Sequence, residues 1–228
     1  MRTRCLVYLV VSIFYHRGNS SSDLPYPGCG YDLSQTLVGT VMNGTETRPH
    51  QYPWMVFVCG QANIDENGEI KCGEACGGTL ISSRYILTAA HCVVGVGDIQ
   101  DIIVVIGSHS ISESLLNFDY AFLSKVVLYP YYGYEGSFRQ APDIALLELE
   151  QSVTFGPKVN GICLPSEIDV LDEFVDKKAL VAGWGVVSYD NNGIKIKELT
   201  SDSLMEAFVT IRSNEWCKKR RNYEFLKT

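Results

Sequence analysis

The sequence lacks several features that would each indicate a particular class of protein. Its N-terminal apolar run, residues 5–14, is much shorter than the about 20 residues that a membrane-spanning helix needs. The formal net charge of −7 counts against nucleic-acid binding, which usually needs a basic face. Internal repeats and a glycine-rich phosphate loop are also missing. We therefore expect no membrane span, no nucleic-acid partner and no cofactor.

The composition that is present is typical of a secreted globular protein. Of the 228 residues, 46% are hydrophobic and 20% are charged, which supplies a core and argues against disorder. Arg2 and Arg4 precede the N-terminal apolar run, and the segment of residues 18–22 that follows it is polar. This pattern predicts a signal peptide over residues 1–22 and an extracellular location.

Short apolar runs separated by turn residues, with almost no helical periodicity, predict an all-β fold. Six of these runs precede residue 150, enough to close one small antiparallel barrel. They are residues 54–58, 78–81, 85–89, 102–106, 122–128 and 144–149. Beyond Cys163 only residues 179–183 and 204–211 are typical of strands, and two strands do not close a barrel.

Two motifs place chemically useful side chains at the ends of predicted strands. Residues 87–92 read Leu-Thr-Ala-Ala-His-Cys, and residues 143–149 read Asp-Ile-Ala-Leu-Leu-Glu-Leu. His91 follows one apolar run, and Asp143 precedes another. An imidazole base and an orienting carboxylate must meet in space, so we expect the chain to fold back between them.

In this order the two motifs resemble those of the trypsin/chymotrypsin-like serine proteases, and the resemblance extends over about residues 29–217. It implies a chymotrypsin-like double antiparallel β-barrel, with the first barrel complete and the second truncated. A propeptide-like segment over residues 23–40 would precede a peptidase domain over residues 41–228. The resemblance also implies that His91 is the general base and acid, that Asp143 holds its tautomer, and that the substrates are proteins or peptides.

The sequence departs from the family pattern at two places. The family's Gly-Asp-Ser-Gly-Gly stretch, which carries the nucleophile and the oxyanion hole, does not occur among the 228 residues, and neither does the specificity pocket. No other serine lies in a Gly-x-Ser-x-Gly or Ser-x-x-Lys motif, so we expect no hydrolysis by this chain. Val41 would be the mature N-terminus of the zymogen, but Thr40 precedes it where the family has a basic residue. Asn19 and Asn43 are candidate glycosylation sites.

The cysteines agree with an oxidising compartment. The resemblance implies that Cys76 pairs with Cys92 and that Cys29 pairs with Cys163, while the polar insert between Cys59 and Cys72 suggests a local bridge. Cys217 is then left unpaired and prone to an intermolecular disulfide. A zinc site that combines Cys72 and Cys76 with His91 and Cys92 is disfavoured, because adjacent histidine and cysteine ligands fit tetrahedral geometry poorly, so we expect no metal.

Three hypotheses remain open from the sequence. The chain is part of a protease whose sequence is cut short, a secreted pseudoprotease that acts as a binding or decoy module, or a remnant without function. Intact His91 and Asp143 favour the first, because a scaffold freed from catalysis has no chemical need for either residue.

Overall fold

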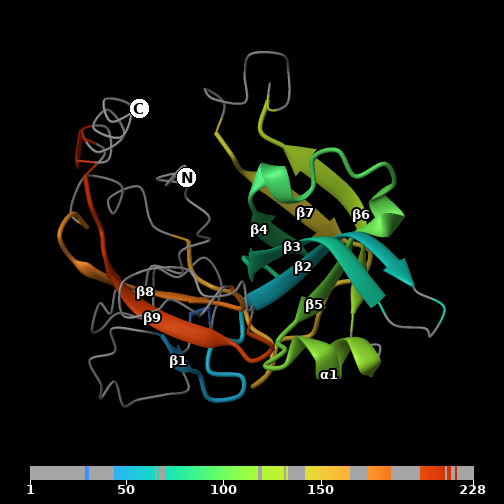
Figure 1. The fold of residues 1–228 in the computed structure, drawn as a ribbon, viewed down its shortest axis with the longest axis horizontal. Coiled ribbons are helices and arrows are strands. Elements are labelled where there is room, and N and C mark those ends of the chain that lie inside the picture. The colour runs from blue at the N-terminus through green and yellow to red at the C-terminus, as the bar shows by residue number, and fades with distance from the viewer. Residues whose placement is uncertain are drawn as a thin grey trace.

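The computed structural model describes residues 29–30, 44–64, 66, 70–117, 120–130, 132, 142–164, 174–185, 201–213, 215–216 and 219. Figure 1 shows a barrel on one side and a smaller sheet beside it. The strands are β1 (Thr45–Glu46), β2 (Met55–Ile64), β3 (Ile70–Leu80), β4 (Tyr85–Thr88), β5 (Ile103–Ile106), β6 (Ala121–Leu128), β7 (Ala145–Leu149), β8 (Lys178–Gly183) and β9 (Met205–Thr210). The helices are α1 (Ile111–Leu116) and the 3₁₀ turns η1 (Ala90–Cys92) and η2 (Ile99–Asp101).

Six strands close the barrel in the order β2-β3-β4-β7-β6-β5, with antiparallel pairing throughout. Alternate residues point inward, as in β7, where Ala145, Leu147 and Leu149 are buried. These side chains pack with Trp54 and other apolar residues into one core. The six predicted strands correspond to the six barrel strands, so the all-β prediction is confirmed.

The hairpin of β2 and β3 is longer than the sequence predicts. The polar insert between Cys59 and Cys72 has a composition typical of a surface loop, yet the strand pairing continues to Ile64 opposite Ile70. An antiparallel ladder satisfies its own backbone hydrogen bonds and tolerates a solvated face, so polar side chains do not end it. The Cys59–Cys72 disulfide closes across this hairpin.

The second sheet has three strands among the described residues, in the order β1-β9-β8. The two strands predicted beyond Cys163 are β8 and β9, and they pair along their whole length. The short strand β1, which the sequence does not reveal, pairs with the start of β9. A closed barrel with a second sheet is the chymotrypsin-like arrangement that the resemblance implied.

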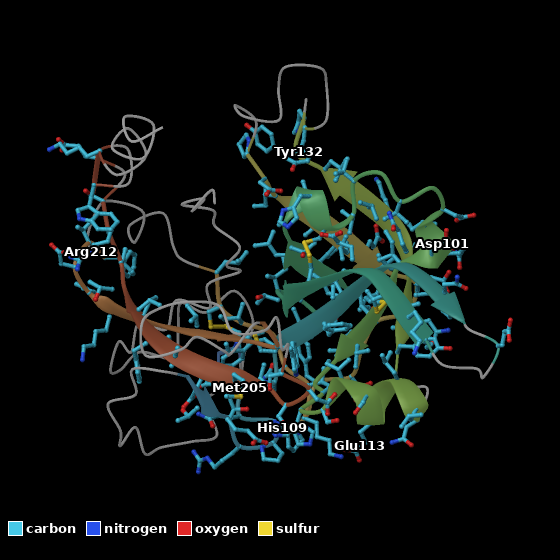
Figure 2. The ribbon with its side chains drawn as sticks, viewed as in Figure 1. Asp101, His109, Glu113, Tyr132, Met205 and Arg212 are labelled. Atoms are coloured by element: carbon cyan, nitrogen blue, oxygen red, sulfur yellow. A yellow bond between two sulfur atoms is a disulfide. The ribbon has the colours of Figure 1, made fainter. Side chains whose placement is uncertain are left out.

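The segment between β5 and α1 joins the barrel to the second sheet. The carbonyl oxygen of His109 accepts hydrogen bonds from the backbone N–H of Leu204 at 2.9 Å and from the indole N–H of Trp184 at 3.1 Å. The carboxylate of Asp202 accepts from the Ser110 hydroxyl at 2.7 Å, at the start of α1. Figure 2 shows His109 beside Met205, the first residue of β9. This segment is therefore one of the contacts that hold the second sheet against the barrel, beside the hydrogen bonds of Gln51 and Tyr52 to Glu206 on β9.

Within the described part of the chain, no helix combines the length and apolar character that crossing a bilayer requires.

Candidate active site

Strand β4 and the turn after it position His91. The Thr88 hydroxyl at the end of β4 donates to the carbonyl oxygen of Gly77 on β3 at 2.8 Å. The chain then enters η1, where Ala90 and Cys92 are buried on either side of His91. With its neighbours anchored in the core, His91 keeps 21% of its side chain exposed. The imidazole is thus held on a fixed turn and remains open to solvent on one side.

Strand β7 brings Asp143 to this turn. Thr88 pairs with Ala145, so the end of β4 meets the start of β7. One carboxylate oxygen of Asp143 lies 2.7 Å from Nδ1 of His91, and the other accepts the backbone N–H of His91 at 2.9 Å. The two residues are 52 positions apart in the sequence, yet the carboxylate contacts both the ring and the backbone of the histidine.

This two-point contact decides which nitrogen of His91 acts as the base. An ionised carboxylate can only accept a hydrogen bond, so the neutral ring carries its hydrogen on Nδ1, facing Asp143, and its lone pair on Nε2. A neutral imidazole in this tautomer takes up a proton at Nε2, and the nearby carboxylate then stabilises the imidazolium. The arrangement is therefore that of a general base with its orienting group.

The comparisons with known proteins agree with this geometry. The Trypsin family model matches residues 41–227. The chain belongs to the trypsin family. Venom serine protease 34 of Apis mellifera is 35% identical over 166 residues, which cover 71% of this chain and 37% of that protein. Venom serine protease Bi-VSP of Bombus ignitus is 31% identical over 210 residues, covering 88% of this chain and 52% of that protein.

A third relative of this trypsin-family chain is Melanization protease 1 of Drosophila melanogaster, which is 31% identical over 191 residues. The match covers 75% of this chain and 44% of the relative. The chain thus spans about half the length, or less, of the curated relatives that it matches.

The pKa of Asp143 in this trypsin-family site is lowered from its ordinary value of 3.8. Burial is the largest single influence and would raise the pKa. The backbone N–H of His91, its imidazole and its charge lower the pKa, as does a hydrogen bond from Tyr132, and together these outweigh burial. The lowered pKa therefore keeps the carboxylate of Asp143 ionised at neutral pH.

The lowered pKa of Asp143 should make the free energy of unfolding depend on pH. Because the pKa of Asp143 is lower in the folded state, its ionised form stabilises the fold above the unfolded-state pKa, and this contribution is lost as the pH falls through the folded-state pKa. We expect the free energy of unfolding to fall between about pH 5 and about pH 2, and to fall less in Asp143→Asn, which cannot titrate there. Urea unfolding at several pH values measures both curves. Parallel curves for the two proteins would contradict the assignment.

Tyr132 is a residue of the site that sequence reasoning missed. Its hydroxyl hydrogen-bonds to Asp143, and Figure 2 shows it at the end of the barrel from which β7 starts. The only signal in the sequence is a tyrosine-rich stretch, residues 129–134, shortly before the aspartate. Such a stretch is equally typical of a surface loop, so the contact becomes visible only once β6 and β7 are paired.

Among the described residues, three disulfides join the cysteines in the pairs named from the sequence. They are Cys29–Cys163, Cys59–Cys72 and Cys76–Cys92. The third ties β3 to the turn that carries His91. The remaining sequence-predicted sites, namely the signal peptide, Asn19, Val41, Asn43 and Cys217, lie outside the described residues.

Proposed function

We propose that this chain supplies the base and orienting group of a secreted trypsin-like serine endopeptidase that hydrolyses peptide bonds in proteins or peptides. The observation that carries the proposal is the two-point contact of Asp143 with the ring and backbone of His91, at 2.7 and 2.9 Å. A carboxylate that served only as an ion-pair partner would not need to fix both the position and the tautomer of the ring.

In this mechanism His91 acts twice. Nε2 first removes the proton from the attacking hydroxyl, and the resulting imidazolium is held by the ionised carboxylate of Asp143. The same nitrogen then returns the proton to the leaving amine. The attacking serine and the oxyanion-hole donors of the family are not among the 228 residues. They would have to come from polypeptide that these residues do not include.

We therefore predict that the 228 residues alone do not react with a serine-directed phosphonate probe. An intact relative of the trypsin family, treated in parallel, provides the positive control, and intact-mass spectrometry detects the adduct. The expected result is no mass increase over hours. Labelling of any serine that disappears in His91→Ala would overturn this prediction, because it would place a nucleophile within the chain.

The assignment of a peptidase is tested on the product of the native gene. Reading the transcript beyond the codon for Thr228 should reveal a Gly-Asp-Ser-Gly-Gly continuation, and the protein purified from its source should react with the phosphonate. A stop codon at that position, together with a stable secreted protein that does not react, would contradict the endopeptidase.

Secretion and activation complete the proposal. The pattern of residues 1–22 supports a signal peptide, and the start of the family match at residue 41 supports a propeptide-like segment over residues 23–40 with Val41 as the mature N-terminus. Thr40 does not suit an activator that cleaves after basic residues. Glycosylation at Asn19 or Asn43 and an intermolecular disulfide through Cys217 also belong to this proposal.

A second candidate function is that of a non-catalytic binding or decoy module. The absence of a nucleophile motif among the 228 residues favours it, as does the closed barrel with its disulfides, which needs no catalytic machinery. The two candidates differ in what they require of the imidazole. A binding module should tolerate His91→Ala without loss of partner binding, whereas the native peptidase should lose turnover.

A further inference from the structure

The carboxylate of Asp143 is contacted at two points by His91, the residue that it has to orient. One oxygen accepts the backbone N–H of His91 at 2.9 Å, and the other lies 2.7 Å from Nδ1. An ionised carboxylate has about four acceptor positions, so these contacts leave room for donors from other elements. An orienting group holds its partner more precisely when a separate part of the fold also anchors it.

The chain that follows β6 is tied to the residue beside Asp143. Just beyond the paired end of β6, the backbone N–H of Tyr129 donates to the carbonyl oxygen of Ile144 at 3.1 Å. The backbone N–H of Tyr132 then donates to the carbonyl oxygen of Tyr129 at 3.0 Å. Because Ile144 directly follows Asp143, these hydrogen bonds bring Tyr132 close to the aspartate.

The side chain of Tyr132 reaches the carboxylate from this position. Its ring is half-buried and packs against the barrel core. Its hydroxyl hydrogen-bonds to Asp143, and the phenol is the donor because an ionised carboxylate only accepts. Figure 2 shows Tyr132 at the end of the barrel from which β7 starts. Tyr132 is therefore a third donor to the carboxylate, and it lies outside the turn that carries His91.

We propose that Tyr132 is a positioning residue of the peptidase: its hydroxyl holds the carboxylate of Asp143 independently of His91, so that the carboxylate can fix the ring. The effect on hydrolysis rests on the proposed function, whereas the contact between hydroxyl and carboxylate does not depend on it. Tyr132 touches neither Nε2 nor the proton that Nε2 would transfer in this mechanism, and it acts only through Asp143.

The hydroxyl of Tyr132 also favours the ionised form of Asp143. Burial raises the pKa of the carboxyl group, while the N–H groups of His91 and the hydroxyl of Tyr132 lower it. Removing only the hydroxyl should therefore raise the pKa of Asp143. It should also let the carboxylate turn together with the imidazole, which directs the lone pair of Nε2 less precisely at an attacking hydroxyl.

Carbon-13 NMR titration of Asp143 in the full chain tests the contact without any hydrolysis. Tyr132→Phe keeps the ring and removes the hydroxyl, so its Asp143 carboxyl should titrate at a higher pH than in the unmodified chain. Tyr52→Phe is the matched control, because the Tyr52 hydroxyl also donates to a carboxylate, that of Glu206 on β9. This variant should leave the titration of Asp143 unchanged. An unchanged titration in Tyr132→Phe would overturn the proposal.

A measurement on the unmodified chain does not depend on whether Tyr132→Phe folds. Protonation of the carboxylate weakens the hydrogen bond that it accepts, so the Cζ resonance of Tyr132 should shift at the pH where Asp143 titrates. Asp143→Asn cannot titrate, so this step should be absent from its Tyr132 signal. A Tyr132 resonance that ignores the titration of Asp143 in the unmodified chain would also overturn the proposal.

A double-mutant cycle on the native protein separates positioning from a merely structural role. Tyr132→Phe should lower kcat about 10-fold with KM within about twofold, which is the size expected for one hydrogen bond to a charged group. In the Asp143→Asn background the same change should alter kcat by less than about twofold, because no ionised carboxylate remains to be held. Equal losses in both backgrounds would overturn the positioning role. If the unmodified native protein hydrolyses no peptide, the proposed function fails, while the NMR titration still decides the contact of Tyr132.

Discussion

In the proposed peptidase, Asp143→Asn should lower kcat about 10⁴-fold, with KM changed little. That magnitude is the one known for the serine-protease template of this same family. An asparagine amide would present N–H groups to Nδ1, which favours the tautomer with its hydrogen on Nε2, and that tautomer cannot accept a proton from a hydroxyl. Steady-state hydrolysis of a peptide substrate by the purified native protein measures both constants.

Asp101→Asn is the matched control for this substitution. Asp101 is an exposed carboxylate in η2, and Figure 2 shows it on a different side of the barrel from Tyr132, which contacts Asp143. Its replacement removes the same charge from the protein without touching the imidazole, so kcat of the proposed peptidase should stay within about twofold of the unmodified protein. A comparable loss in both variants would show that net charge, and not the tautomer of His91, governs the rate.

The barrel was predictable from the sequence because hydrophobic burial determines it. Each of its six strands has an apolar run whose exposure to water is unfavourable. Closing the sheet into a barrel buries the apolar side chains of all six strands in one core. The pairing of His91 with Asp143 was accessible only through the family resemblance. Spacing alone places each residue at a strand end, whereas the register of β4 against β7 brings them together.

The elements that escaped prediction are those held by backbone and polar contacts. Strand β1 has two residues and is defined by its pairing with β9, more than 150 positions away. Helix α1 has six residues, is capped by Ser110 and is held by Asp202, which lies shortly before β9. Such elements carry little periodic signal of their own, because their partners are distant in the sequence.

Gly107→Ala should destabilise the fold more than any other glycine-to-alanine change among the described glycines, by about 2 to 6 kcal/mol. Gly107 has a φ of +72°, a backbone conformation that residues with a side chain rarely adopt. In addition, an added Cβ would overlap the backbone carbonyl oxygen of Lys158. Neither obstacle can be relieved by rotating a side chain. Because Gly107 begins the segment that carries His109, a shift here should also loosen the contact between His109 and Trp184.

Two other glycines separate the causes of this loss. Gly95 has φ +84° but no atom within 4 Å of an added Cβ, so Gly95→Ala should cost only the conformational strain, about 1 to 2 kcal/mol. Gly77 lies in β3 with open space around it, so Gly77→Ala should stay within about 0.5 kcal/mol of the unmodified protein. Urea unfolding followed by tryptophan fluorescence compares the three variants. If Gly95→Ala proved as costly as Gly107→Ala, crowding against Lys158 would contribute nothing to the loss.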